Sequence, residues 1–231
     1  MKSMTFKEQF IFNFVENKRW QFILTGLENT LLITFFAVIV GIILGFLIAI
    51  VRSTHDKTGK FKILNFLCQI YLTVIRGTPV MVQLLIVYYI IFATYDPGKV
   101  IVAILAFGLN SAAYVAEIVR SGIMSIDQGQ FEAGRSLGFN YTQTMIYIII
   151  PQAFKNVLPA LANEFIVLLK ETSISGYIGL MDLTRGGDII RSQTYEPLFP
   201  LLAVALIYLV LVMILTYLVG KLERRLRNNE R

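Results

Sequence analysis

Few residues of this 231-residue chain are suited to catalysis or metal binding. It contains one cysteine, Cys68, which excludes an internal disulfide, and one histidine, His55. Zinc sites require several nitrogen or sulfur ligands, and a serine-type triad requires a histidine beside a nucleophile, so neither is expected. The sequence also has no G-x-x-x-x-G-K-[ST] stretch, the loop that cradles nucleotide phosphates. We therefore predict no catalytic residue, no metal and no cofactor in this chain.

Charge is scarce as well, because charged residues make up 16% of the chain against about 25% in soluble domains. The uncharged runs at 31–51 and 198–220 are each long enough to cross the ~30 Å hydrocarbon core of a bilayer as a helix. A net charge of +6 would suggest nucleic-acid binding in a soluble protein, but the cations here flank apolar runs. We predict an all-α polytopic membrane protein in a lipid bilayer, with no nucleic-acid partner.

Apolar stretches predict five transmembrane helices, at about 21–52, 61–94, 99–124, 153–171 and 198–220. The second stretch would reach about 50 Å as one helix, which is too long for one span. Pro79 disfavours helix at Thr78, so we predict a break there, with Thr78 as N-cap and Pro79 at the first helical position. The N-terminus of such a half-helix suits a carboxylate.

Basic residues predict the sidedness of the chain. They follow the first and fifth spans and also occur after the third, which places these regions in the cytoplasm and the N-terminus outside. The basic residues of the N-terminal segment favour the opposite orientation, but the odd number of spans and the basic C-terminus outweigh them. We predict an amphipathic segment at 1–20, one membrane domain at 21–220 and a basic cytoplasmic tail at 221–231.

Polar residues recur near the middle of three spans. Ionisable groups at this depth are costly and by default indicate a function or an ion pair. Arg76 and Glu164 either pair or each meet one charge of a zwitterionic solute, and asparagines at this depth also join helices by hydrogen bonds. Glu117, nearer the cytoplasmic end, is expected to pair with Arg120. The candidate solute-binding residues are Arg76, Thr78, Asn110, Asn163 and Glu164.

The polar segment 125–151 predicts two short helices on the cytoplasmic side. Ser125 and Gln128 have capping-box spacing, as do Asn140 and Gln143, and Gly138 between them suits a left-handed turn. We expect the second helix to end at Pro151. Such a module suits docking into a groove of another protein, and the alternative is a re-entrant or membrane-surface helix.

This segment resembles the EAA loop of the membrane subunits of ABC importers. The family pattern is Glu-Ala-Ala, three residues, Gly, nine residues, Ile, one residue and Leu-Pro, and the matching residues here are Glu132, Ala133, Gly134, Gly138, Ile148, Ile150 and Pro151. Gly134 stands where the pattern has alanine, and Ile150 where it has leucine. YVAEIVRSGIMSIDQGQ, PQAFKNVLPALANEFIVLLKETS and VIRGTPVMVQ extend the resemblance, over roughly residues 20–220, to the polar-amino-acid branch of these permeases.

The resemblance implies a type I ABC importer permease fold and a multi-pass protein of the prokaryotic cytoplasmic membrane. It implies a second permease copy, an extracytoplasmic amino-acid-binding protein, and an ABC ATPase subunit that binds ATP and Mg and receives the loop as a coupling helix. The segment 172–197 would form part of the outer gate or docking surface. The implied coupling residues are Glu132, Ala133, Gly134, Arg135 and Gly138.

We predict an importer permease for a polar amino acid. Glu164, an anion near the middle of its span, favours a basic solute such as arginine, lysine or histidine, and glutamine or glutamate is the alternative. Two alternative functions belong to other classes of membrane protein. An ion-driven secondary transporter would work without an ATPase, and an intramembrane enzyme would need paired catalytic residues.

Overall fold

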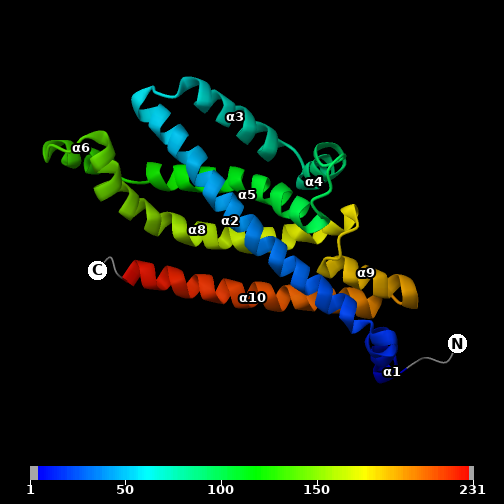
Figure 1. The fold of residues 1–231 in the computed structure, drawn as a ribbon. Helices are drawn as coiled ribbons and strands as arrows, with labels where there is room; N and C mark the ends of the chain where they lie inside the picture. The colour runs from blue at the N-terminus through cyan, green and yellow to red at the C-terminus, as the bar shows by residue number, and fades with distance from the viewer. Residues whose placement is uncertain (1–4, 229–231) are drawn as a thin grey trace. The chain divides into compact units, whose positions relative to one another are not determined.

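The computed structural model describes residues 5–228, and its regular elements within that range are all helical (Figure 1). Residues 1–4 of the predicted N-terminal segment and 229–231 of the predicted tail lie outside the described residues. The α-helices are α1 (Phe6–Phe10), α2 (Trp20–Thr58), α3 (Lys62–Gly77), α4 (Val80–Ile86), α5 (Lys99–Met124), α6 (Gln128–Ser136), α7 (Tyr141–Thr144), α8 (Ile150–Glu171), α9 (Leu183–Thr194) and α10 (Leu198–Asn228). Shorter π or 3-10 stretches are η1 (Ile11–Val15), η2 (Glu16–Lys18), η3 (Val87–Ile91), η4 (Met145–Ile149) and η5 (Thr172–Ile178).

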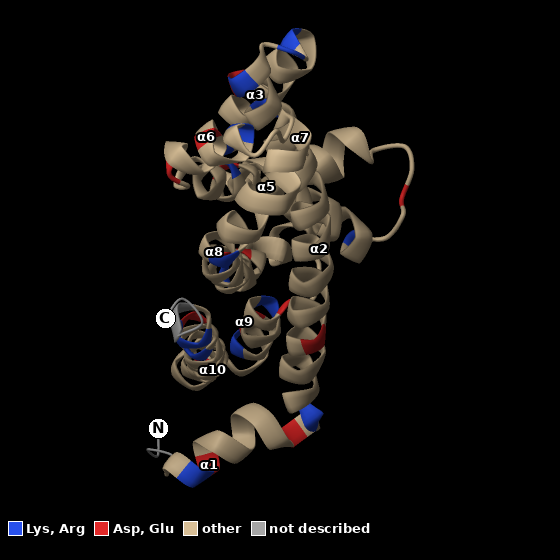
Figure 2. Ribbon diagram, turned by 90° about the vertical axis from the view of Figure 1, so that its left-hand side faces the viewer, with Lys and Arg blue, Asp and Glu red and all other residues tan. Residues whose placement is uncertain are grey.

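Four helical stretches are long and apolar enough to cross a membrane, and a fifth span arises if the broken pair of helices on either side of Pro79 counts as one. Charged residues occupy short stretches of the ribbon, and most of the length of α2 is uncharged (Figure 2). The predicted break is present, because α3 ends at Gly77 and α4 begins at Val80. The helix boundaries differ slightly from the prediction, because α4 begins at Val80 and not at Pro79. Thr78 is the C-cap of α3, and its hydroxyl donates to the Val74 carbonyl at 2.8 Å.

Two local predictions are wrong. Ser125 does not cap α6: its hydroxyl donates to the Gly122 carbonyl, and Asp127 is the N-cap, accepting from the Gly129 N–H at 2.6 Å. Pro151 does not end a helix, because α7, η4 and α8 follow one another without a break. Pro151 lacks the N–H that a continuous helix would use at this position, and the wide π turn η4 directly before it provides room for the ring.

The chain divides into two compact units. The first comprises Met1–Ala37, Val80–Phe107 and Ile166–Leu215, and the second comprises Val38–Pro79, Gly108–Phe165 and Thr216–Arg231. Each of α2, α5, α8 and α10 therefore contributes one end to each unit.

In the first unit, α9 packs closely on α2. A Cβ added at Gly26 would lie 2.5 Å from the Asp182 carbonyl oxygen, so only glycine permits this approach. The Asn29 amide donates to the Met181 carbonyl at 2.8 Å, and the Leu183 N–H donates to the Thr30 hydroxyl at 3.1 Å. The segment between the last two spans is thereby fixed to α2.

Asp182, the N-cap of α9, is fully buried and accepts from the Arg185 N–H at 3.0 Å. Burial raises the pKa of this carboxyl from 3.8 to about 6, although the helix N–H groups oppose the shift. The folded state therefore holds the proton more tightly than the unfolded state. Stability is greatest while the group is protonated, and part of it is lost as the pH rises from about 4 to about 6.

We predict that Asp182→Asn flattens this pH dependence, since an amide oxygen still caps the helix but carries no charge to bury. The measurement is the thermal midpoint of the detergent-solubilised chain at pH 4.5, 6 and 8. Relative to wild type, the Asp182→Asn variant should gain a few degrees at pH 8 and little at pH 4.5. Asp188→Asn is the matched control, because this partly exposed carboxylate of the same helix pairs with Arg185 and Arg191. An unchanged pH profile in Asp182→Asn would contradict the assignment.

Candidate functional site

The second unit contains an open cavity of about 610 Å³ between the end of α3, the middle of α5 and α8. Arg76 and Glu164, two of the predicted solute-binding residues, both line it. The cavity is also lined by Glu117 and Tyr114. The sequence predicted a structural pair for Glu117 and no role for Tyr114. The other predicted residues, Thr78, Asn110 and Asn163, are not among those that line this cavity.

Glu164 on α8 is nearly buried, with 9% of its surface exposed. Its Oε1 accepts a hydrogen bond from the Ser111 hydroxyl of α5 at 3.1 Å. Ser111 is itself buried against α2, because a Cβ added at Gly41 would lie 2.8 Å from the Ser111 side chain. Asn110, the neighbour of Ser111, is 2% exposed, whereas Asn163 lies on the exposed side of α8. The two polar clusters of α5 and α8 therefore meet through Ser111 and Glu164.

Arg76 lies at the last turn of α3, and its guanidinium is 3.5 Å from the Glu117 carboxylate. Glu117 also pairs with Arg120 at 2.5 Å, which confirms that predicted pair, and with Arg52 of α2 at 3.9 Å. The Arg76 side chain remains 44% exposed, 6.0 Å from the ring centroid of Tyr114. Arg76 thus has a structural partner and still faces the cavity that Glu164 lines.

The segment between α5 and α8 has the predicted helix–turn–helix form. Helix α6 ends in a turn at Gly138, whose φ of +80° is the left-handed conformation that glycine adopts most readily. Asn140 and Gln143 form the predicted capping box at the start of α7, with both hydrogen bonds at 2.9 Å.

Gly134 is buried within this segment, and a Cβ placed there would lie 2.7 Å from the Thr144 methyl carbon. Glycine at this position of the pattern therefore lets α6 pack closely against α7. By contrast, four of the predicted coupling residues are exposed: Glu132, Ala133, Arg135 and Gly138. The segment accordingly has an inner face that packs on the chain and an outer face available to a partner.

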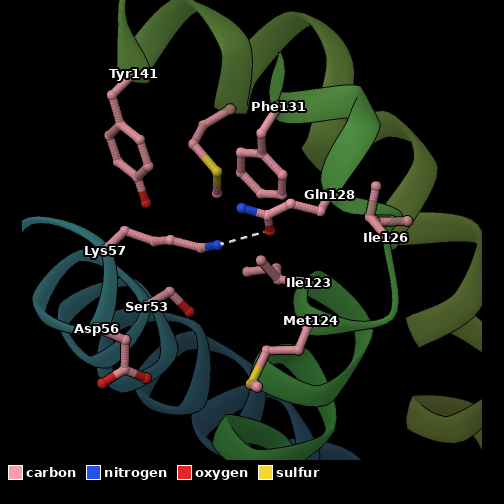
Figure 3. Close-up of a pocket in the computed structure, with 10 residues that line it drawn as sticks. Ser53, Asp56, Lys57, Ile123, Met124, Ile126, Gln128, Phe131 and Tyr141 are labelled. Carbon is pink, nitrogen blue, oxygen red and sulfur yellow. Dashed lines mark hydrogen bonds between the residues drawn. The ribbon is translucent and has the colours of Figure 1, made fainter. Parts of the chain in front are cut away.

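The inner face of α6 is attached to the end of α2 across a second cavity, of about 320 Å³ (Figure 3). Lys57 extends from the last turn of α2, with its Nζ 4.5 Å from the centroid of the Phe131 ring and 3.4 Å from the Gln128 amide oxygen. This cation–π contact and hydrogen bond connect the first span to the segment. Sequence reasoning identified the segment but missed this attachment, since residues 57 and 131 are far apart in the chain.

Known proteins match the chain over most of its length. The family model described as "Binding-protein-dependent transport system inner membrane component" matches residues 41–228. The chain is 42% identical to the arginine transport system permease protein ArtQ of Bacillus subtilis (strain 168), over 90% of this chain and 94% of ArtQ. It is 33% identical to the glutamine transport system permease protein GlnP of Escherichia coli (strain K12), over 89% of this chain and 93% of GlnP.

A solved crystal structure of an amino acid ABC transporter with histidines has the same fold. The TM-score is 0.85 at 41% identity, over 96% of this chain and 99% of that chain. This agreement confirms the predicted all-α, type I ABC permease architecture. The chain therefore belongs to the family of binding-protein-dependent transport system inner membrane components, and within it to the ABC permeases for polar amino acids.

Proposed function

We propose that this permease imports a basic amino acid, such as arginine, lysine or histidine, across the cytoplasmic membrane of a prokaryote. Two copies of the chain form the pathway, and an extracytoplasmic binding protein delivers the solute. A separate ATPase subunit binds ATP and Mg and drives the cycle from the cytoplasmic side, where the C-terminus lies; the N-terminus is outside.

The observation that carries the solute proposal is the pairing of opposite charges in one cavity. Glu164 offers a nearly buried carboxylate oriented by Ser111, and Arg76 offers a guanidinium at the same cavity. An amino acid presents the complementary pair, an α-ammonium and an α-carboxylate. A basic side chain adds a second cation for Glu164, and such charge-assisted bonds are the strong ones.

The comparisons with known proteins support a basic solute and keep one alternative open. ArtQ is an arginine permease, and the similar solved transporter was crystallised with histidines. GlnP is a glutamine permease, so glutamine or glutamate is the second candidate. An ion-driven transporter has no such support, because the relatives are subunits of ABC systems.

The outer face of the coupling segment supports the ATPase proposal. Glu132, Ala133 and Arg135 project from a helix whose other side is anchored by Lys57 and by close packing at Gly134. A rigid helix with exposed side chains on one face suits insertion into a groove of a partner protein. The basic residues at 52–62 and 221–225 support the same cytoplasmic sidedness.

We predict that Glu164→Gln weakens solute binding, because the amide loses the charge-assisted interaction with the solute's cation. In proteoliposomes holding the assembled complex, the apparent affinity for L-arginine uptake should fall by about tenfold or more, and the preference for L-arginine over L-glutamine should shrink. Glu223→Gln, the same chemical change at an exposed position of α10, should leave both unchanged. Unchanged affinity and preference in Glu164→Gln would remove Glu164 from the site.

We also predict that Glu132→Ala weakens the association with the ATPase, since its exposed carboxylate offers a charge to a basic residue of the partner. The measurements are the amount of ATPase that co-purifies in detergent and the ratio of solute imported to ATP hydrolysed. Glu16→Ala, an exposed glutamate before the first span, is the control. If Glu132→Ala retains both full association and full coupling, this residue does not belong to the interface.

A further inference from the structure

Three arginines from three helices share the carboxylate of Glu117. Arg120 of α5 lies 2.5 Å from it, Arg76 of α3 lies 3.5 Å from it, and Arg52 of α2 lies 3.9 Å from it. Among the described residues, Asp56 also acts electrostatically on Arg120, but it forms no ion pair with it within 4 Å. The cluster of Glu117 and its three arginines therefore holds more positive than negative charge, and two of its members, Arg76 and Glu117, line the cavity.

The three ion pairs are not equivalent. Glu117 holds Arg120 through Oε1, one turn away on the same helix, whereas Arg76 and Arg52 share Oε2 at longer distances. Arg76 is also the most exposed of the three, at 44% against 23% for Arg120 and 17% for Arg52. Arg76 is thus the arginine that can exchange partners most readily, and it lines the cavity together with Glu117 and Glu164.

We propose that Glu117 is an internal substitute for the solute's α-carboxylate: it holds Arg76 until the solute binds and releases it when the solute's α-carboxylate takes its place. This inference rests on the proposed amino acid site. The exchange replaces one carboxylate at Arg76 by another, so no guanidinium loses its counter-charge. Glu117 keeps Arg120 and Arg52, so the exchange leaves no unpaired carboxylate in the protein.

This arrangement has a consequence for selectivity. A solute with a carboxylate can displace Glu117 from Arg76, whereas an amine without one leaves the Arg76–Glu117 pair in place. Competition from Glu117 also lowers the affinity for the correct solute, which favours its release into the cytoplasm. Glu117 is therefore a specificity-determining residue that acts through Arg76.

The test compares L-arginine with L-argininamide, whose α-carboxylate is replaced by a neutral amide. Binding of each is measured by calorimetry on the assembled complex of permease and ATPase without nucleotide. Glu117→Gln should bind L-arginine about threefold to tenfold more tightly than wild type, as expected when a competing ion pair is removed. L-Argininamide has no carboxylate to compete for Arg76, so its affinity should not rise, and Glu223→Gln should change neither affinity.

A second variant keeps the test valid if Glu117→Gln fails to assemble. Glu117→Asp preserves the charge of the cluster but withdraws the carboxylate from Arg76 by one bond length, ~1.5 Å. It should also favour L-arginine selectively, by a smaller factor. Equal losses for both ligands, or no change for either, would overturn the inference.

If the solute is not a basic amino acid, the wild-type complex will not bind L-arginine. This result is distinct from any effect of the Glu117 variants. L-Glutamine and L-glutaminamide then form the pair for the same variants, because the inference concerns the α-carboxylate alone. Selective tightening for L-glutamine in Glu117→Gln would support the inference even though the solute is not basic, and its absence would overturn it.

Discussion

The cost of placing carboxylates within membrane-spanning helices governs the arrangement of the second unit. Glu164 is nearly buried and is matched by Ser111 on the facing helix, while Glu117 is matched by arginines of three helices. These contacts require close helix packing, which Gly41 and Gly45 of α2 allow: a side chain at either would collide with α5. Because an unmatched ion at this depth is strongly unfavourable, the glycines, the polar partners and the cavity depend on one another.

Two of the three helices that line that cavity continue directly into the segment 125–151. Helix α5, which contributes Glu117, ends at Met124, and only three residues separate it from α6. Helix α8, which contributes Glu164, begins directly after α7 and the π turn η4. A displacement of α6 by a bound ATPase would therefore be transmitted to the two helices that hold the charged residues. The contact of Lys57 with Phe131 extends the same linkage to α2, so α2, α5 and α8 are all attached to this segment.

The features that the sequence predicted correctly depend on local backbone preferences and on composition. The helix break at Pro79 and the turn at Gly138 follow from backbone preferences, and the apolar runs predict the spans. The predicted helix end at Pro151 was wrong, because the chain accommodates this proline with a π turn that no residue type indicates. The partner of Arg76 could not be predicted either, because Glu117 is distant in sequence and reaches Arg76 only once α3 and α5 have packed together. The roles of the solute-binding residues remain predictions.

We propose that this chain imports a polar amino acid only as part of an ATP-driven assembly. The most direct measurement is uptake of a panel of labelled amino acids into proteoliposomes that contain the permease, its ATPase and the binding protein. We expect concentrative uptake of a basic amino acid that requires ATP and all three proteins and is insensitive to collapse of ion gradients. Uptake by the permease alone, driven by an ion gradient, would contradict it, as would ATP hydrolysis that no amino acid stimulates.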